Sequence, residues 1–402
     1  MTQRTQRSPR TRQGMAVLAA ALLSATAACT ASQAPAPGPA ADAPLPGAPS
    51  PAGGGHGKAA RGITIAATGD VLPHASIIRQ ANADAGGDGY DFTQMLAGAK
   101  PVISKADLAI CHMETVYGAN GDYTGYPTFK SPPQVAAALA ETGYDACSTA
   151  SNHTLDAGPQ GLRRTLDALD KAGIRHSGSY RSAKDASRPT LMNVGAAKVA
   201  HIAATYGTNG FPLPKGQPWA VNQLNERKII ADARAARKAG ADIVVFSPHW
   251  GTEWQDAPDA KQRTLARRLT ASRSGGRPDI DLIIGTHAHV PQAYEKVNGT
   301  WVIYGMGDQI AGSMINYSGA HDPRGNMGTI GRFTFLPPKQ PGGRWETGKA
   351  EFIPQWFDTE EGRVVNLNAA IKRGADYTDV RDRIRRVVLS RGAAKQGLVM
   401  GQ

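Results

Sequence analysis

Short apolar segments that alternate with amphipathic stretches constrain the fold of this chain more than any other feature. The apolar segments occupy residues 63–68, 108–113, 146–150, 199–205, 243–247, 282–285 and 301–304. Stretches with helical periodicity lie between them, at 133–142, 159–172, 225–239 and 257–272. Apolar strands joined by crossover helices indicate α/β layers rather than an all-β fold. Further strands at 332–336 and 350–357 and a closing helix at 378–389 are also predicted.

Most of these predicted strands end in residues that can bind metals. In chain order, the strand ends carry Asp70, Glu114, Asn152, His249 and the pair His287 and His289. In α/β sheets the loops at the carboxyl ends of strands converge on one edge, where ligands bind. We therefore expect these side chains to meet in one site.

The donor types are chemically coherent. Carboxylates, an amide oxygen and imidazoles suit divalent ions such as Mn, Zn or Fe. The His287-x-His289 pair is the most informative motif, because packing rarely places two histidines at alternate positions of an extended segment. A carboxylate shared by two ions would create a two-metal site that activates water and holds a phosphoryl oxygen. Asp70 and Glu114 are the candidates for that shared ligand, and two divalent ions are predicted.

The first 28 residues have the composition of a secretory signal. Arginines without any acid precede an apolar stretch at 15–28, which is too short to span a bilayer. Residues 26–29, Thr-Ala-Ala-Cys, resemble a bacterial lipobox, in which Cys29 would be lipidated. We therefore expect a lipid-anchored protein on the outer face of the cytoplasmic membrane. Simple secretion after cleavage near Ala28 is the alternative.

Residues 29–61 consist mainly of Ala, Pro and Gly, and they predict a disordered tether before a folded domain at 62–402. The formal net charge of +12 is compatible with anionic polymers or lipid head groups as partners, or with a solvated basic surface. Because no dense run of Lys and Arg with interleaved aromatic residues occurs, nucleic acid is not an expected partner.

Two further cysteines, Cys111 and Cys147, each lie inside a predicted strand. Buried cysteines commonly behave as small apolar residues, so two free thiols are predicted. A disulfide between neighbouring strands is the alternative in an oxidising compartment.

The combined motifs resemble those of CapA/PgsA-type poly-γ-glutamate capsule proteins, which are similar to calcineurin-like metallophosphatases. The resemblance covers roughly residues 62–311 and rests on motifs that begin at Gly69, Asn152, His249 and Gly285, together with Glu114. They are Gly-Asp, Asn-His-x-x-Asp-x-Gly, His-Trp-Gly-x-Glu and Gly-x-His-x-His. The resemblance implies a four-layer α-β-β-α sandwich with the site region in one domain.

The resemblance also implies roles for individual residues. The implied metal ligands, with the second as the bridge, are Asp70, Glu114, Asn152, His249, His287 and His289. His153 would protonate the leaving group, and Asp156 would orient the ring of His153. A role for Asp156 as the helix N-cap before Pro159 is equally open. Trp250 would be a packing residue and Glu253 a contact near the ligands.

Three positions depart from the family pattern. His74 follows Asp70 by four residues instead of the superfamily's Asp-x-His, His112 stands where the capsule proteins usually have Asn, and Asp308 also replaces Asn. These residues are expected to alter the choice of metal or substrate.

Two functions follow from the sequence. The first is a metal-dependent, phosphoesterase-like hydrolase that acts on a phosphoester or an anionic envelope polymer in poly-γ-glutamate or capsule metabolism. The alternative is a non-catalytic lipoprotein subunit of a membrane synthase or export complex. The set of metal-type residues favours the first, since a scaffold has no need of them.

Overall fold

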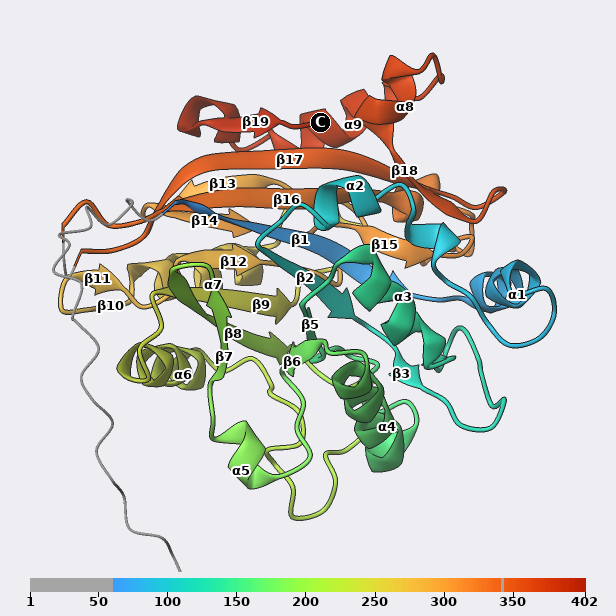
Figure 1. Cartoon of the computed structure of the whole chain (residues 1–402), viewed down its shortest axis with the longest axis horizontal. Coiled ribbons are helices and arrows are strands. Elements are labelled where there is room, and N and C mark those ends of the chain that lie inside the picture. The colour runs from blue at the N-terminus through green and yellow to red at the C-terminus, as the bar shows by residue number, and fades with distance from the viewer. Residues whose placement is uncertain (1–60, 341–342) are drawn as a thin grey trace, which may run out of the picture. The chain divides into compact units, whose positions relative to one another are not determined.

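A mixed nine-stranded sheet forms one half of the computed structural model, which describes residues 61–340 and 343–402 (Figure 1). Its path runs β18 (Arg363–Asn366), β17 (Glu346–Asp358), β16 (Met327–Leu336), β1 (Ile63–Leu72), β2 (Leu108–Met113), β5 (Ala146–Ser148) and β6 (Arg175–Ser177). Two short strands join it, β15 (Asp308–Ala311) beside β1 and β19 (Leu398–Met400) beside β17. Strands β1, β2, β5 and β6 are parallel, so their carboxyl ends share one edge.

A second sheet of six strands has the order β13 (Tyr294–Val297), β14 (Thr300–Ile303), β12 (Leu282–Ile284), β9 (Ile243–His249), β8 (Ala197–Thr205) and β7 (Thr190–Val194). Its four inner strands are parallel, and the two outer strands are antiparallel to their neighbours. Two small ribbons pair β3 (Val116–Tyr117) with β4 (Lys130–Ser131) and β10 (Arg273–Ser274) with β11 (Arg277–Pro278).

The helices lie outside the two sheets. They are α1 (Ala75–Asp84), α2 (Lys100–Ile103), α3 (Gln134–Thr142), α4 (Gly158–Lys171), α5 (Ala183–Ala186), α6 (Glu226–Lys238), α7 (Ala260–Ala271), α8 (Leu367–Lys372) and α9 (Thr378–Val388). Single turns of 3₁₀ helix occur at Gln94–Leu96, Pro323–Asn326 and Ala393–Gln396. In Figure 1, α8 and α9 lie along β17, which they contact.

Alternating side chains along the strands build four layers. Ile65 of β1 and Val245 of β9 belong to one buried cluster between the two sheets. Their neighbours point the other way, because successive strand residues face opposite sides. Ala66 therefore packs in the cluster with α1 and α3, and Val244 packs with α6 and α7. The predicted α-β-β-α sandwich is confirmed, and each fully buried Val or Ile contributes about 1.5–3 kcal/mol to its stability.

The predicted strands and helices occur close to their expected positions. Residues 108–113 coincide with β2, and the predicted helix at 159–172 is shifted by one residue in α4. The elements not predicted include α1, β7, β13, β15 and β18. The signal segment, Cys29 and nearly all of the tether lie outside the described residues, so these predictions stay open.

Cys111 and Cys147 form a disulfide rather than the two free thiols that were predicted. They lie directly opposite each other on the parallel strands β2 and β5, with their Cα atoms 4.4 Å apart. The sequence places each cysteine on a strand, but only strand order and register bring the two sulfurs together.

Gly69 allows the end of β1 to approach the loop before β15. The Asp70 N–H donates a hydrogen bond to the Gly307 carbonyl at 3.1 Å. A Cβ atom at Gly69 would lie 1.6 Å from that same carbonyl oxygen, so no other residue fits without a backbone shift. This contact fixes Asp70 beside Asp308, its partner in the β1–β15 register.

We expect Gly69→Ala to lower the free energy of unfolding by about 1–3 kcal/mol or more, because overpacking forces the backbone to move. Gly207→Ala is the matched control, since a Cβ there meets nothing within 4 Å. Urea denaturation followed by circular dichroism measures both. Equal unfolding midpoints for the two variants would contradict the close approach.

Candidate metal centre

Residues from the carboxyl ends of both sheets meet in one buried cluster. Asp70 lies on β1, Glu114 directly follows β2, and Asn152 lies in the loop between β5 and α4. The second sheet contributes three imidazoles, one at the end of β9 and two in the loop after β12: His249, His287 and His289. Each of the six residues is at most 6% exposed. The structure thus brings together all the residues predicted as ligands, whose role as ligands stays a prediction.

Glu114 belongs to two groups of possible metal ligands in this cluster. On one side Glu114, Asp70 and His289 offer ligand atoms that lie within 4.8 Å of one another. On the other side Glu114, His249 and His287 do the same. A carboxylate shared by two donor sets has the place of a bridging ligand in a two-metal site. Asp70 is also shared, by the set with Glu114 and His289 and by a set with His112 and His249, so both carboxylates stay candidates for the bridge.

Several buried atoms of the cluster have no hydrogen-bond partner within the described part of the chain. They include both carboxylate oxygens of Glu114, Oδ1 of Asp70 and Nδ1 of His287. An unpaired buried polar group costs about 1–3 kcal/mol, and a charged one costs more. Burial raises the pKa of Asp70 and of Glu114 well above the usual range, because a carboxylate charge is poorly solvated there. Divalent cations would satisfy these atoms, so the donor set fits metal binding.

Two of the imidazoles are held in the neutral form, which binds metals. Burial lowers the pKa of His249 and of His287 well below the usual value, so both rings are neutral at physiological pH. Nε2 of His249 lies 2.9 Å from Oδ1 of Asn152 and 3.4 Å from Oε1 of Glu114. These three side chains therefore point at a common position.

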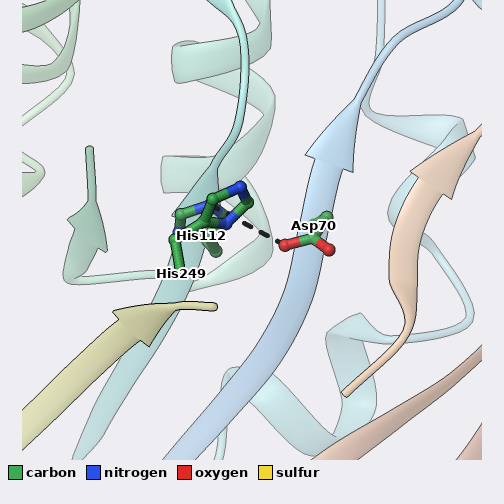
Figure 2. Close-up of side chains that lie close together, drawn as sticks. All are labelled: Asp70, His112 and His249. Carbon is green, nitrogen blue, oxygen red and sulfur yellow. Dashed lines mark ion pairs between the residues drawn. The ribbon is translucent and has the colours of Figure 1, made fainter. Parts of the chain in front are cut away.

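His112 also reaches the cluster, although the sequence identified it only as a departure from the family pattern. In Figure 2 its ring overlaps that of His249, and a dashed line joins the pair to Asp70. Nε2 of His112 lies 3.7 Å from Oδ1 of Asp70. The ring stacks on His249 at 4.6 Å, and its Nδ1 lies 2.6 Å from the Ser148 hydroxyl. Such a bond on the other ring nitrogen is typical of histidines that bind metals. The spacing to Glu114 could have revealed this residue, since alternate strand residues share one face.

Asp308 orients His289. Its Oδ1 lies 3.0 Å from Nδ1 of His289, which leaves Nε2 on the side of Glu114, 4.0 Å from Oε1. Burial opposes protonation of His289, but the carboxylates of Asp308 and Glu114 outweigh it and raise the pKa of the imidazole. With Asn at position 308, this carboxylate would be absent.

The loop after β12 holds its histidines in a strained backbone. The φ angles of His287 and His289 are 94° and 57°, in the left-handed region that non-glycine residues rarely adopt. Strain of this kind is concentrated at functional sites, where the surrounding structure maintains it. The N–H of His287 donates to Oδ2 of Asp70 at 3.1 Å, which ties this loop to the first sheet.

His153 and Asp156 form the pair that the sequence predicted. Nδ1 of His153 lies 2.6 Å from Oδ2 of Asp156, which also accepts a hydrogen bond from the Phe129 N–H at 2.7 Å. Asp156 is not the N-cap of α4, a position held by Ala157 without a side-chain cap. Asp156 therefore orients the ring of His153 rather than capping α4. The catalytic role of the pair stays a prediction.

The remaining residues that were singled out surround the cluster. Trp250 is buried and donates its indole N–H to the Tyr304 carbonyl at 2.9 Å, so it packs as expected. Glu253 lies 3.9 Å from Nε2 of His287.

His74 receives a hydrogen bond from the Gly312 N–H and lies outside the ligand sets. Tyr206, which the sequence did not indicate, packs its ring 4.4 Å from that of His287.

Two facing sheets with helices outside, and a buried set of carboxylates, amide and imidazoles at their shared carboxyl edge, define a metallophosphatase-like protein. The family model described as "Bacterial capsule synthesis protein PGA_cap" matches residues 64–313. The chain belongs to this family, as the sequence motifs predicted.

Relatives of the chain are found among capsule and polyglutamate proteins. The capsule biosynthesis protein CapA of Bacillus anthracis is 28% identical over 174 residues, which are 42% of this chain and 41% of that protein. A probable polyglutamine synthesis accessory protein of Mycobacterium tuberculosis is 29% identical over 218 residues, or 51% and 55% of the two chains. The alignments thus span about half the length of these relatives.

A solved structure, a putative 5'-nucleotidase from Staphylococcus aureus in complex with alpha-ketoglutarate, is similar at a TM-score of 0.45 and 16% identity. The match covers 72% of this chain and 54% of that one. Because the likeness is that distant, the four-layer architecture rests on the packing of this chain's own sheets and helices.

We expect a purified chain of residues 59–402 to bind about two divalent ions per molecule, because two donor sets share Glu114. His112→Asn should lower the affinity for metal by roughly ten-fold or more, since it removes an oriented imidazole. Elemental analysis and calorimetric titration with Mn²⁺ or Zn²⁺ measure both quantities.

His176→Asn is the matched control. His176 lies on the outer strand β6, away from the cluster, where it pairs with Asp170 of α4. Its metal content should equal that of the parent. Absence of stoichiometric metal after loading would contradict the site as a whole. Equal affinities of parent and His112→Asn would contradict only the part assigned to His112.

Proposed function

We propose that this chain is a metal-dependent, phosphoesterase-like hydrolase of capsule or envelope polymer metabolism. The observation that carries the proposal is the position of Glu114, buried and shared by two donor sets. His153, held by Asp156, lies beside the same cavity as His289, which gives the site a proton donor next to the donor sets. Both components are needed for hydrolysis of a phosphoester.

Two sets of residues would hold the ions. One set comprises Asp70, Glu114 and His289, with His112 beside Asp70, and the other comprises Glu114, Asn152, His249 and His287. Bound divalent ions supply an activated water and neutralise the charge on phosphoryl oxygens. The identity of the ions, among Mn, Zn and Fe, is part of the proposal.

The chain's own residues would handle the proton. Water adds to phosphorus and releases one proton to solvent, the P–O bond to the leaving group breaks, and the departing oxygen takes a proton from Nε2 of His153, which regains it from solvent. Asp156 accepts from Nδ1 of His153 at 2.6 Å, which fixes the ring and leaves Nε2 to face the substrate. Tyr206 covers the rings of His249 and His287, where it limits access of bulk water.

A second function is supported by the names of the relatives. The Mycobacterium tuberculosis relative is described as a probable accessory protein of polyglutamine synthesis. On this alternative the chain is a non-catalytic subunit that associates with a membrane synthase or export complex. The buried donor sets would then bind metal only to stabilise the fold.

We expect His153→Ala to lower turnover by about 10²–10⁴-fold, the contribution typical of a general acid. The substrate should be a phosphoester with an alkyl leaving group, because such an oxygen needs a proton as it departs. Metal content should not change, whereas His287→Ala should lose metal and turnover together. Steady-state kinetics and elemental analysis distinguish the two variants.

Full activity of His153→Ala on a substrate that the parent cleaves would show that the proton comes from elsewhere. If the parent cleaves no phosphoester or γ-glutamyl substrate, and both variants support polymer production in cells, the accessory function is correct. His176→Asn again serves as the control with unchanged activity.

We also propose that the chain is exported and anchored by a lipid on Cys29. No helix in the described ranges is long and apolar enough to cross a membrane. The disulfide between Cys111 and Cys147 supports export, because disulfides persist in oxidising compartments. The basic charge of the chain is compatible with an anionic membrane surface or polymer.

If Cys29 carries the anchor, Cys29→Ser should move the protein from the membrane fraction to the soluble fraction, because the thiol to which the lipid is attached is lost. Immunoblots of fractionated cells measure the distribution. Cys147→Ser tests whether loss of any cysteine has the same effect, and it should leave the distribution unchanged. Unaltered membrane association of Cys29→Ser would indicate that the N-terminal segment is retained as the anchor.

A further inference from the structure

A cavity of about 390 Å³ opens beside the metal centre. His289 and His153 lie on its polar side, together with His74 and Glu253. Most of the other lining residues are apolar or aromatic, and six of them come from two loops and the segment after β15: Tyr126, Phe129, Trp254, Met314, Ile315 and Tyr317. Ser313 and Asn316 add polar groups. A group that leaves the centre past His153 therefore enters an aromatic space.

The aromatic rings are held against the residues of the centre. The ring of Phe129 meets His153 edge-on at 4.8 Å and His74 at 5.0 Å. Trp254 lies 6.2 Å from His289 and has a φ angle of 65°, in the strained left-handed region. The indole is thus maintained in the wall next to His289 at an energetic cost.

The rim of the cavity exposes large apolar side chains. Tyr126 is 80% exposed, Tyr317 is 75% exposed and Ile315 is 55% exposed. Exposed rings that gather around a concave site are available to cover a ligand, and tyrosine does so at little cost in side-chain entropy. The rim therefore extends the aromatic surface of the cavity outward.

The charges of the cavity do not match an anionic chain. Among the described residues that line it there is no lysine or arginine; Glu253 is acidic, and the imidazole of His289 already faces the carboxylates of Asp308 and Glu114 at the centre. A γ-linked glutamate chain carries one carboxylate per unit, and each unit beyond the centre would meet apolar rings or Glu253. Complementary charge is what steers and orients an anionic partner, and the lining away from the centre offers no lysine or arginine to supply it.

We propose that this cavity binds an uncharged group with a planar ring, which is joined through an ester oxygen to the phosphoryl group at the centre. The inference rests on the proposed function and narrows its substrate to ring-bearing phosphoesters. Tyr317 and Trp254 supply the faces on which the ring stacks, and His153 faces the ester oxygen. The anionic part of the substrate lies at the metal centre.

Binding of two non-hydrolysable phosphonates to the metal-loaded chain tests the inference without turnover. Phenylphosphonate should bind roughly ten-fold more tightly than methylphosphonate, because stacking and burial of the ring act only on the former. Calorimetric titration gives both affinities. Tyr317→Ala should lower their ratio, whereas Phe211→Ala, which removes an exposed ring that does not line the cavity, should keep it.

Equal affinities of the two phosphonates, or binding of neither, overturn the inference. Tighter binding of a γ-linked glutamate peptide than of phenylphosphonate overturns it as well. A preserved ring preference in a protein that cleaves no phosphoester would leave the cavity assignment intact and remove only the proposed hydrolysis. The two proposals therefore fail by different results.

Discussion

The structure depends on two carboxylates, Asp70 and Glu114, that are fully buried between two sheets without sufficient counter-charge. Isolated charges cost several kcal/mol in such an interior, so the site is stable only with a cation or a proton beside them. The buried histidines provide neutral donors rather than positive charge, with His289 as the exception. Because the two carboxylates lack counter-charge, metal binding best accounts for the cluster.

Rigid sheets make the arrangement possible. Glu114 and Asp70 come from neighbouring parallel strands, whereas the imidazoles come from the facing sheet and its loops. The approach of Gly69 to Gly307 and the strained backbone at His287 and His289 are local costs that the packed core maintains. Side chains from distant parts of the chain are therefore placed to within hydrogen-bonding distance, as a reactive centre requires.

The surroundings of the centre distinguish the two functions. A stabilising metal needs only the ligands, but this site also has His153 oriented by Asp156 and a cavity that opens next to both. These features favour chemistry on a bound ligand. The aromatic walls of the cavity contrast with the polyanionic polymer for which the relatives are named, so the family name and the substrate of this chain are separate questions.

The sequence by itself determined the α/β layers, most strand and helix positions, and the residues that gather at the centre, while the resemblance of its motifs to a known family implied that the layers number four. Apolar periodicity and the residue that follows each strand are local properties, and they can be recognised without coordinates. Only the tertiary structure decided that Asp70 and Glu114 are each shared by two donor sets, that His112 reaches Asp70 and that Asp308 orients His289. It also decided the pairing of Cys111 with Cys147 and the aromatic cavity. These features depend on register and on contacts between residues far apart in the chain, which no local pattern encodes.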